Sequence, residues 1–306
     1  MYRTILVPCD GSNPSEYAIP FAIEIARRDK GSVTLLRALP DSLLVTDLPT
    51  AVQASSRRLA EIEMARLKKA FESSEVPVSV RMRIGFPVEE ILLAAATSDL
   101  IVMTTHGRGG INRWVMGSVA DKAIRLSSVP VLAIHPPEKR TRAMAEAAAL
   151  RMFRDVCVPL DGSPLAERSL AELGQFAGGE ARINLMRTVA KDAGGAAEDL
   201  ADNYLQDVAS KLEARGVRVT RSVQKGDNAA EEIAKYAIRT GCGLIVMTTH
   251  GASGITRWML GGVTDKVVRR GPTPVLAIRA SRKLWKGGKR PLAAAPRKKK
   301  KSTIVI

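Results

Sequence analysis

Two blocks of this sequence occur twice and in the same order, which limits the chain to folds built from two copies of one domain. Residues 5–12 (ILVPCDGS) return as residues 156–163 (VCVPLDGS), at an offset of 151. Residues 100–107 (LIVMTTHG) return unchanged as residues 244–251, at an offset of 144. Because whole blocks keep their order over such distances, the repeat is a duplicated domain and not a short solenoid repeat.

Each half alternates short β-branched runs with helical patterns, which is typical of a parallel sheet covered by helices. The fold class predicted is therefore α/β, with two repeated open five-stranded parallel-sheet domains that carry helices on both faces. With 306 residues, 45% of them hydrophobic, the chain is long enough to give each half its own core. The expected strands are residues 4–8, 33–39, 78–84, 100–105 and 131–135, then 155–159, 182–189, 217–223, 244–249 and 275–279. The expected helices of the first half are residues 16–28, 52–72, 88–97 and 119–126.

The chain divides into two domains, a linker and a tail. We expect the first domain at residues 1–136, the linker at 137–152, the second domain at 153–280 and a tail at 281–306. The linker is rich in Ala, Arg and Glu, which favours a helix. The tail consists mainly of Lys, Gly, Pro and Ala, which cannot bury enough apolar surface to fold, so we expect it to be disordered.

Positive charge is concentrated at the carboxyl end. Residues 279–306 hold eleven Lys or Arg and no acidic residue, so that the rest of the chain has 36 basic residues against 31 acidic ones. The two domains are therefore only mildly basic. A run of basic residues in a tail is either a solvated extension or a site for polyanions such as nucleic acid, and both remain open.

The longest apolar runs are only a few residues, far short of the ~20 that a membrane-spanning helix needs. The start of the sequence has no charged, long apolar and small-residue regions in the order of a secretory signal, so we expect a cytoplasmic protein. Cys9, Cys157 and Cys242 are an odd number, with no CxxC pair and no His at metal-ligand spacing. We therefore expect free thiols and no metal site. Cys9 is more readily a buried filler than a redox sensor.

Both strongly repeated blocks lie where a strand ends, and ligands of open parallel sheets bind beyond the carboxyl ends of strands. The first strand runs into Asp10, Gly11 and Ser12. The fourth strand runs into a glycine-rich loop that begins at Gly107, and Gly117 follows at the start of the last helix. Glycines let a backbone approach phosphates closely, and the amides of a helix N-terminus attract anions.

Each of these features also has a purely structural interpretation. Asp10 can simply tighten the turn, and Ser118 with Asp121 matches a capping box, in which Ser118 would be the helix cap. His106 is more readily a histidine that orders the loop than a catalytic group. The sequence contains no GxxxxGK[ST] motif, and no GxGxxG follows the first strand, so a P-loop and a dinucleotide site are not expected.

The combination of motifs resembles the universal stress protein family. Val-Pro-x-Asp-Gly-Ser follows the first strand, and Met-Thr-Thr-His-Gly, nine residues, Gly-Ser and a closing Pro-Val-Leu-Ala-Ile come later. The resemblance covers residues 2–135 and 153–279, and it implies an adenine nucleotide alpha-hydrolase-like fold in each half. It also implies that the halves pair through their last strands, residues 131–134 against 275–278, which are short apolar edges that need covering.

The resemblance further implies an ATP site, since the family's pattern is G-x-x-G, nine residues, then G-[ST]. Thr104 stands in place of the first glycine, and Thr248 does so in the second half. Gly262 stands in place of the Ser or Thr of the second half. The nucleotide-binding residues carried over are Pro8, Asp10, Met103, Thr104, His106, Gly107, Gly117, Ser118, Val119 and Ala120, with Asp161, Met247, Gly251, Gly261 and Gly262 in the second half.

By this resemblance the chain is a stress-response protein that binds ATP or a related adenine nucleotide, with Mg²⁺ as a further ligand, and acts by nucleotide-dependent association with partners. A homodimer is a further expectation. One alternative is a slow ATPase, which needs a carboxylate or His106 placed on a water near the γ-phosphate. Another is a scaffold whose Lys-rich tail binds nucleic acid. No catalytic residue is predicted.

Overall fold

The computed structural model describes residues 1–40, 50–106, 116–176, 181–249, 261–271, 273–279 and 304–305. The first-half strands are β1 (Thr4–Pro8), β2 (Ser32–Leu39), β3 (Val78–Ile84), β4 (Leu100–Thr104) and β5 (Val131–Ile134). The later strands are β6 (Asp155–Pro159), β7 (Arg182–Val189), β8 (Arg218–Lys225), β9 (Leu244–Thr248), β10 (Val275–Ile278) and β11 (Ile304–Val305). All ten expected strands are present. In the inner strands, β-branched and aliphatic runs bounded by turn residues mark burial well, whereas β8 is an edge strand with no buried residue.

The described helices flank these strands in chain order. They are α1 (Asn13–Glu16), α2 (Ile19–Asp29), α3 (Thr50–Lys69), α4 (Pro87–Ala95), α5 (Ser118–Leu126), α6 (Arg142–Arg151), α7 (Ser169–Phe176), α8 (Gly195–Glu213), α9 (Ala229–Arg239) and α10 (Gly262–Arg270). The helix expected at residues 16–28 is instead divided into α1 and α2. Pro20 lies in the first turn of α2 and has no backbone N–H to continue the hydrogen bonds of α1, which explains the break.

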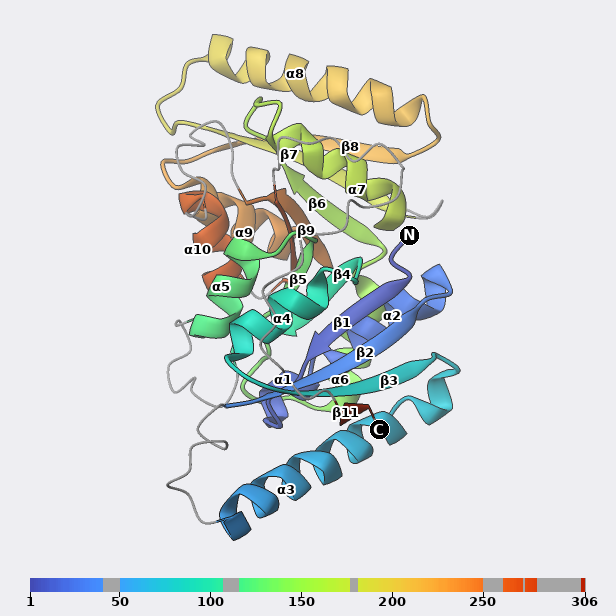
Figure 1. The fold of residues 1–306 in the computed structure, drawn as a ribbon. Coiled ribbons are helices and arrows are strands. Elements are labelled where there is room, and N and C mark those ends of the chain that lie inside the picture. The colour runs from blue at the N-terminus through green and yellow to red at the C-terminus, as the bar shows by residue number, and fades with distance from the viewer. Residues whose placement is uncertain are drawn as a thin grey trace.

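The described strands form one eleven-stranded sheet with the order β11-β3-β2-β1-β4-β5-β10-β9-β6-β7-β8 (Figure 1). Within each half the neighbouring strands are parallel. The halves meet where β5 and β10 pair antiparallel, with Leu132 opposite Leu276. This confirms the expected pairing through the last strands and gives the chain an internal pseudo-twofold axis.

The tail is described only at Ile304 and Val305, which form β11 and pair antiparallel with Met82 and Arg81 of β3. The expected disorder does not hold for these two residues. A sheet edge offers unpaired N–H and C=O groups to any nearby extended chain, which is the physical reason for such pairing. The remainder of the Lys-rich tail lies outside the described residues.

The hydrophobic cores are organised by face of the sheet and not by half, contrary to the expectation of one core per half. One core lies under α2, α3, α6, α7 and α8 and includes residues from both halves, such as Phe21, Met64 and Leu205. The other lies under α4, α5, α9 and α10 and includes Ile124 and Ile233. Since the sheet is continuous across the β5–β10 junction, each face presents one apolar surface to its helices.

The expected linker helix is α6, which packs against α2 of the first half. Two contacts near it join the halves on this face. The hydroxyl of Tyr2 donates to Glu172 Oε2 at 2.7 Å, and the Arg28 guanidinium lies 4.0 Å from the centre of the Phe153 ring. The halves are therefore fixed to each other by more than the strand pair alone.

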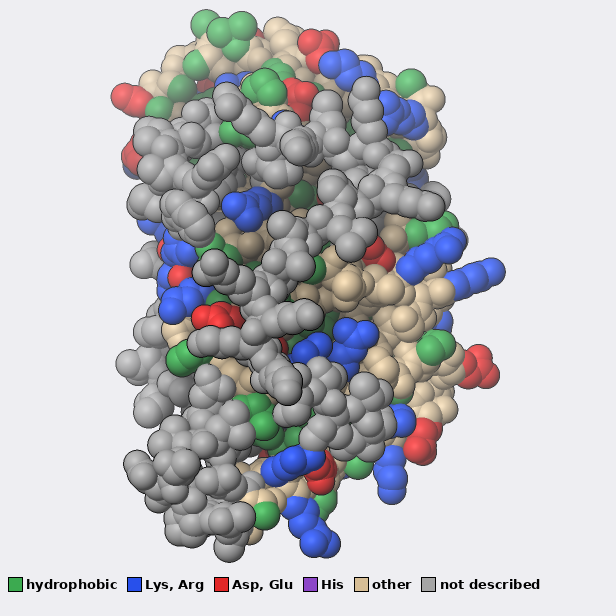
Figure 2. Space-filling model, viewed as in Figure 1, with side chains coloured by type: hydrophobic (Ala, Val, Ile, Leu, Met, Phe, Trp, Pro, Cys, Tyr) green, Lys and Arg blue, Asp and Glu red, His purple; other side chains and the backbone are tan. Residues whose placement is uncertain are grey.

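The described surface carries mixed charge. In the view of Figure 2, Lys and Arg side chains are interspersed with Asp and Glu side chains and form no single dominant patch. No helix in the described part of the chain is both long and apolar enough to cross a bilayer.

Candidate functional site

The strand order places one crevice in each half. From β1 the chain continues to β2 and β3 on one side, whereas β4 and β5 lie on the other side. The order therefore reverses between β1 and β4, and their last residues, Pro8 and Thr104, lie at the same edge of the sheet. The second half repeats this with β6 and β9. Ligands of open parallel sheets bind at such points.

The loop after β1 is a tight turn held by Asp10. Its Oδ1 accepts hydrogen bonds from the backbone N–H of Ser12 at 2.9 Å and from the Ser12 hydroxyl. Gly11 has a φ of 76°, a left-handed conformation that suits glycine. Ser12 then caps α1, since its side chain accepts from the N–H of Ser15. The turn-tightening role considered for Asp10 is therefore present.

The second half reproduces this turn. Oδ1 of Asp161 accepts from the N–H of Ser163 at 2.9 Å, and Gly162 has a φ of 84°. The two Asp-Gly-Ser turns thus have the same geometry after β1 and β6.

The end of β4 is rigid and buried. Met103 and Thr104 are each 6% exposed, and the Thr104 hydroxyl donates to the carbonyl oxygen of His106 at 2.8 Å. The side chain that replaces the family's first glycine therefore folds back on its own loop. The Thr104 hydroxyl thus has an acceptor within the protein.

His106 belongs to a small polar cluster with Thr105 and His135. The Thr105 hydroxyl lies 2.9 Å from Nδ1 of His106 and 3.3 Å from Nδ1 of His135, and the two rings meet edge to face at 4.9 Å. These contacts hold the His106 ring against the end of β5. They match the interpretation of His106 as a residue that orders the loop.

The start of α5 is tied directly to the end of β4. The N–H of Gly117 donates to the carbonyl oxygen of Thr105 at 2.8 Å, and Gly117 is the N-cap of α5. Ser118, Val119 and Ala120 form the first turn of the helix, with Ser118 exposed and Ala120 buried. The amino end of a nine-residue helix is thus placed at the crevice between β1 and β4.

The capping-box interpretation of Ser118 is wrong. The N-cap is Gly117, which has no side chain to cap the helix. Asp121 forms ion pairs with Arg125 and Arg269 and does not reach back to the N-cap. Ser118 is the first residue of α5 and not the residue before it. Its side chain therefore lies on the exposed side of the first turn.

The second half has the same tether but a different first turn. The N–H of Gly261 donates to Thr249 O at 2.7 Å, and Gly262 is the first residue of α10. Within the part of the chain that the structure describes, a Cβ added to Gly262 would meet no atom within 4 Å. The Thr264 hydroxyl donates to the carbonyl oxygen of Thr248 at 2.8 Å. Met247 is buried at the end of β9, as Met103 is at the end of β4.

Gly107 and Gly251 lie outside the described residues, as do the loops that follow them. Among the residues that the structure describes, no group of three or more His, Cys, Asp or Glu side chains has an arrangement suited to a metal ion. The three cysteines are buried, and burial is the main reason that the pKa of Cys9 is raised to about 12. A thiol with such a pKa is a poor redox sensor.

The structure also shows an arginine at this edge of each half that was not predicted. Arg37 and Arg187 occupy equivalent positions, because Pro8 pairs with Leu36 and Pro159 pairs with Met186 immediately before them. Arg37 is 7% exposed, and its guanidinium lies near Cys9 O at 3.4 Å and Glu63 Oε2 at 3.6 Å. The sequence offered one signal for these two residues, which is an arginine within an apolar strand at the same position of each half.

Arg187 has different neighbours. Its guanidinium lies 5.2 Å from the centre of the Tyr204 ring, and a Cβ added to Gly162 would be 3.1 Å from its Nη1. The Tyr204 hydroxyl donates to Glu167 Oε1 at 3.0 Å. The second crevice is therefore bordered by an arginine and an aromatic ring, whereas the arginine of the first is buried.

Comparison with known proteins shows similarity to universal stress proteins in both halves of the chain. The model of the universal stress protein family matches residues 1–135 and 152–279. A universal stress protein of Methanocaldococcus jannaschii is 34% identical over 146 residues, which are 45% of this chain and 85% of the relative. One of Mycobacterium bovis is 26% identical over 233 residues, which are 71% of this chain and 74% of the relative.

A solved structure of a universal stress protein from Archaeoglobus fulgidus superposes on 92% of this chain and 100% of its own, with a TM-score of 0.71 and 19% identity. A protein from Pseudomonas aeruginosa described as a putative universal stress protein covers 91% of this chain and 93% of its own, with a TM-score of 0.62 and 16% identity. These likenesses concern the fold. Since the family model matches most of the sequence in two copies, the chain belongs to the universal stress protein family.

Proposed function

We propose that this stress protein binds ATP or a related adenine nucleotide in its first half, in the crevice beyond β1 and β4, and associates with partners according to its nucleotide state. One observation carries the proposal. The hydrogen bond from Gly117 N–H to Thr105 O fixes the amino end of α5 at the point where the strand order reverses. The first-turn amides of a helix attract phosphate.

The roles of the other residues follow from this placement. Asp10 and Pro8 border the crevice from β1, and Met103 borders it from β4, so that an adenine ring would lie among them. Ser118, Val119 and Ala120 would present their amides to the phosphates, with Mg²⁺ neutralising the phosphate charge. The glycine-rich loop that starts at Gly107 would complete the cradle.

The test uses the full chain and one obstructing variant. Native mass spectrometry of freshly purified protein should detect retained adenine nucleotide, and calorimetry should give saturable ATP binding. Ser118→Tyr places a bulky side chain on the exposed first turn of α5 and should weaken ATP binding at least ~10-fold, which corresponds to ~1.4 kcal/mol.

The matched control is Lys122→Tyr, one turn further along the same helix and also exposed. It should leave ATP affinity unchanged. Equal affinity in the two variants, or no ATP binding in the parent protein, would contradict the proposal. The slow-ATPase alternative predicts sustained phosphate release that His106→Gln abolishes.

The charge of the tail favours a second, separate role in binding polyanions. Residues 279–306 carry eleven basic and no acidic side chains. Such binding should be independent of base sequence and fall steeply with salt. Replacing Lys298, Lys299, Lys300 and Lys301 by Gln keeps the chain length and should reduce heparin and DNA affinity. Equal affinity of parent and variant would remove this role.

A further inference from the structure

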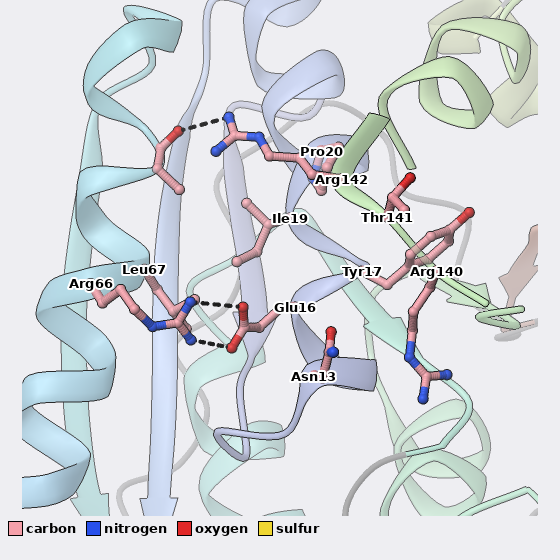
Figure 3. A pocket seen from close by; sticks show the side chains of 11 residues that line it. Asn13, Glu16, Tyr17, Ile19, Pro20, Arg66, Leu67, Arg140, Thr141 and Arg142 are labelled. Carbon is pink, nitrogen blue, oxygen red and sulfur yellow. Dashed lines mark hydrogen bonds and ion pairs between the residues drawn. The ribbon is translucent and has the colours of Figure 1, made fainter. Parts of the chain in front are cut away.

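A cavity lies between α1, α2, α3 and the start of α6, on the face of the sheet opposite α5. Its volume is about 280 Å³, which suits a small molecule. In Figure 3 the Glu16–Arg66 pair lies on one side and Tyr17 with Arg140 on the other, with Asn13 between them. The cavity therefore joins the first half to the segment that leads into α6.

Part of the cavity lining lies outside the repeated domain. Arg140, Thr141 and Arg142 line it, and they lie between the two segments that the family model matches, residues 1–135 and 152–279. A single copy of the domain lacks these residues. The cavity is thus a property of the tandem chain.

The charge around the cavity is positive. Arg66, Arg140 and Arg142 contribute three guanidinium groups, and Glu16 is the acidic residue among the lining side chains. Arg66 binds Glu16 through both terminal nitrogens, with Nη1 at 3.1 Å from Oε2. This pair neutralises itself, and Arg142 is paired with Glu146 outside the lining, so that Arg140 contributes the remaining positive charge.

Arg142 already has two hydrogen-bond acceptors within the protein. Its Nη2 donates to the carbonyl oxygen of Ala70 at 3.3 Å, and its Nε donates to Glu146 Oε1 at 2.8 Å. It therefore connects α6 to the end of α3 over the cavity.

Arg140 is different. Its Nη1 donates to Pro137 O at 3.0 Å, and within the described residues it forms no ion pair with a carboxylate. A guanidinium has five N–H donors in a planar fork that matches a carboxylate, and one contact to a carbonyl leaves donors for a ligand. Arg140 is also only half-buried, which keeps it within reach of a molecule in the cavity.

The wall opposite the solvent is apolar. Tyr17, Ile19 and Leu67 are 9%, 4% and 2% exposed, and each lines the cavity. Burial raises the pKa of Tyr17, so its hydroxyl stays protonated and uncharged. Apolar walls with a few placed polar groups are the common design of small-molecule sites.

We propose that this cavity binds a small organic acid, with the anionic group at Arg140 and the apolar body against Tyr17, Ile19 and Leu67. An apolar wall alone would accept a neutral ligand, and an arginine cluster alone would accept inorganic phosphate. The combination selects a molecule that has both parts. Such a ligand would bridge the first half and the linker, on the face of the sheet opposite α5.

The test measures binding of 1-naphthoate to the full chain by calorimetry, with ATP present in excess to occupy any nucleotide site. 1-Naphthalenemethanol is the neutral analogue, and inorganic phosphate is the anion without an apolar body. Naphthoate should bind at least ~10-fold more tightly than either probe. The neutral alcohol lacks the charged group that accepts the hydrogen bond, and phosphate lacks the apolar body.

Two variants of the lining and one control variant locate the binding. Arg140→Gln should weaken naphthoate ~10-fold to ~100-fold, the range expected for one charge-assisted contact. Arg154→Gln removes an exposed arginine beyond the other end of α6 and should change nothing. Ala70→Leu enlarges a half-buried lining residue while keeping the carbonyl that Arg142 binds, and it should also weaken naphthoate.

Three results would overturn the proposal. They are no binding of naphthoate at millimolar concentration, equal binding of the neutral alcohol, and unchanged affinity in both Arg140→Gln and Ala70→Leu. Circular dichroism of each variant shows whether the fold is kept. If Arg140→Gln unfolds, the Ala70→Leu result and the comparison of probes decide.

Discussion

Nη2 of Arg269 in the second half lies 2.9 Å from Oδ1 of Asp121 in the first half. The symmetry-related pair joins an arginine of the first half to an aspartate of the second. Nη2 of Arg125 lies 3.2 Å from Oδ1 of Asp265. Each aspartate also binds the arginine one turn along its own helix. The four residues are related by the 144-residue offset, so the network obeys the pseudo-twofold symmetry of the strand pair.

The first prediction concerns this network. Its side chains are 22% to 28% exposed, so solvent screens them and each pair stabilises only modestly. A double-mutant cycle of Asp121→Asn and Arg269→Gln should give a coupling of about 0.5–1 kcal/mol in the free energy of urea unfolding at low salt. The coupling should shrink in 1 M NaCl because the Debye length falls to ~3 Å.

Arg57 and Glu61 on α3 provide the control, since their pair is 46% and 36% exposed and lies within one helix. Its coupling should be about 0.3–0.5 kcal/mol. If the pair between the halves couples no more strongly than this one, the network does not hold the halves together.

The second prediction concerns alkaline pH. Burial, with smaller contributions from Asp10 and Glu16, raises the pKa of the Cys9 thiol to about 12. The unfolded chain ionises this thiol at lower pH than the folded chain, so its contribution to stability is complete below the unfolded pKa and is lost as pH rises through the folded value. The unfolding free energy should therefore decline between about pH 9 and about 12.

Cys9→Ala isolates the effect. The variant should be less stable at pH 7, because it loses a buried side chain, but its stability should fall less steeply across the same alkaline window. Urea unfolding at several pH values gives both slopes, and tyrosine ionisation contributes to each equally. If the unfolding free energy falls with pH at the same slope in the parent and in Cys9→Ala, the thiol has the same pKa in the folded and unfolded chains.

The third prediction concerns the place where the linker crosses the second half. A Cβ added to Gly243 would lie 2.3 Å from Arg151 O and 2.7 Å from Met152 Cα. Gly243→Ala must therefore displace backbone, and it should lower the unfolding free energy by about 1–3 kcal/mol. The equivalent first-half residue is Asp99, whose side chain instead accepts hydrogen bonds from Arg3 N–H and Thr4 N–H.

Gly195→Ala is the matched control, because Gly195 begins α8 and an added Cβ there meets no atom within 4 Å. It should be neutral or slightly stabilising. Equal losses in both variants would mean that contact with the linker backbone is not what makes Gly243→Ala costly.

The strands and their parallel orientation were predictable from sequence because they depend on local pattern, whereas the β5–β10 pairing was implied by the family resemblance and by apolar edges that need covering. The break between α1 and α2 was not predicted, because it depends on how Pro20 lies against the preceding turn. The sharing of each core between halves follows from the continuous sheet, which no local pattern encodes. For Ser118, the sequence matches a cap, yet the hydrogen bond from Gly117 to Thr105 O moves the helix start by one residue.

The last prediction is that the first half binds nucleotide more tightly than the second. Ser118 can offer a hydroxyl and an amide to a phosphate, whereas Gly262 offers only its amide, and the Thr264 hydroxyl is already bonded to Thr248 O at 2.8 Å. One hydrogen bond to a charged group contributes about 1.5–3 kcal/mol, or ~10-fold to ~150-fold in affinity. Gly262→Ser meets no steric obstacle among the described residues, so it should tighten ATP binding to the second half without loss of stability.

Ser118→Gly should weaken the first site by a similar factor, and calorimetry of both full-length variants measures the two changes against the parent. Because Ser118 is exposed and caps nothing, its replacement should cost little stability beyond the ~1 kcal/mol of a glycine in a helix. The pair of substitutions therefore exchanges the affinities of the halves while the fold stays constant. If Gly262→Ser leaves the second site unchanged, the hydroxyl is not what distinguishes them, and Arg187 beside Gly162 becomes the difference to examine.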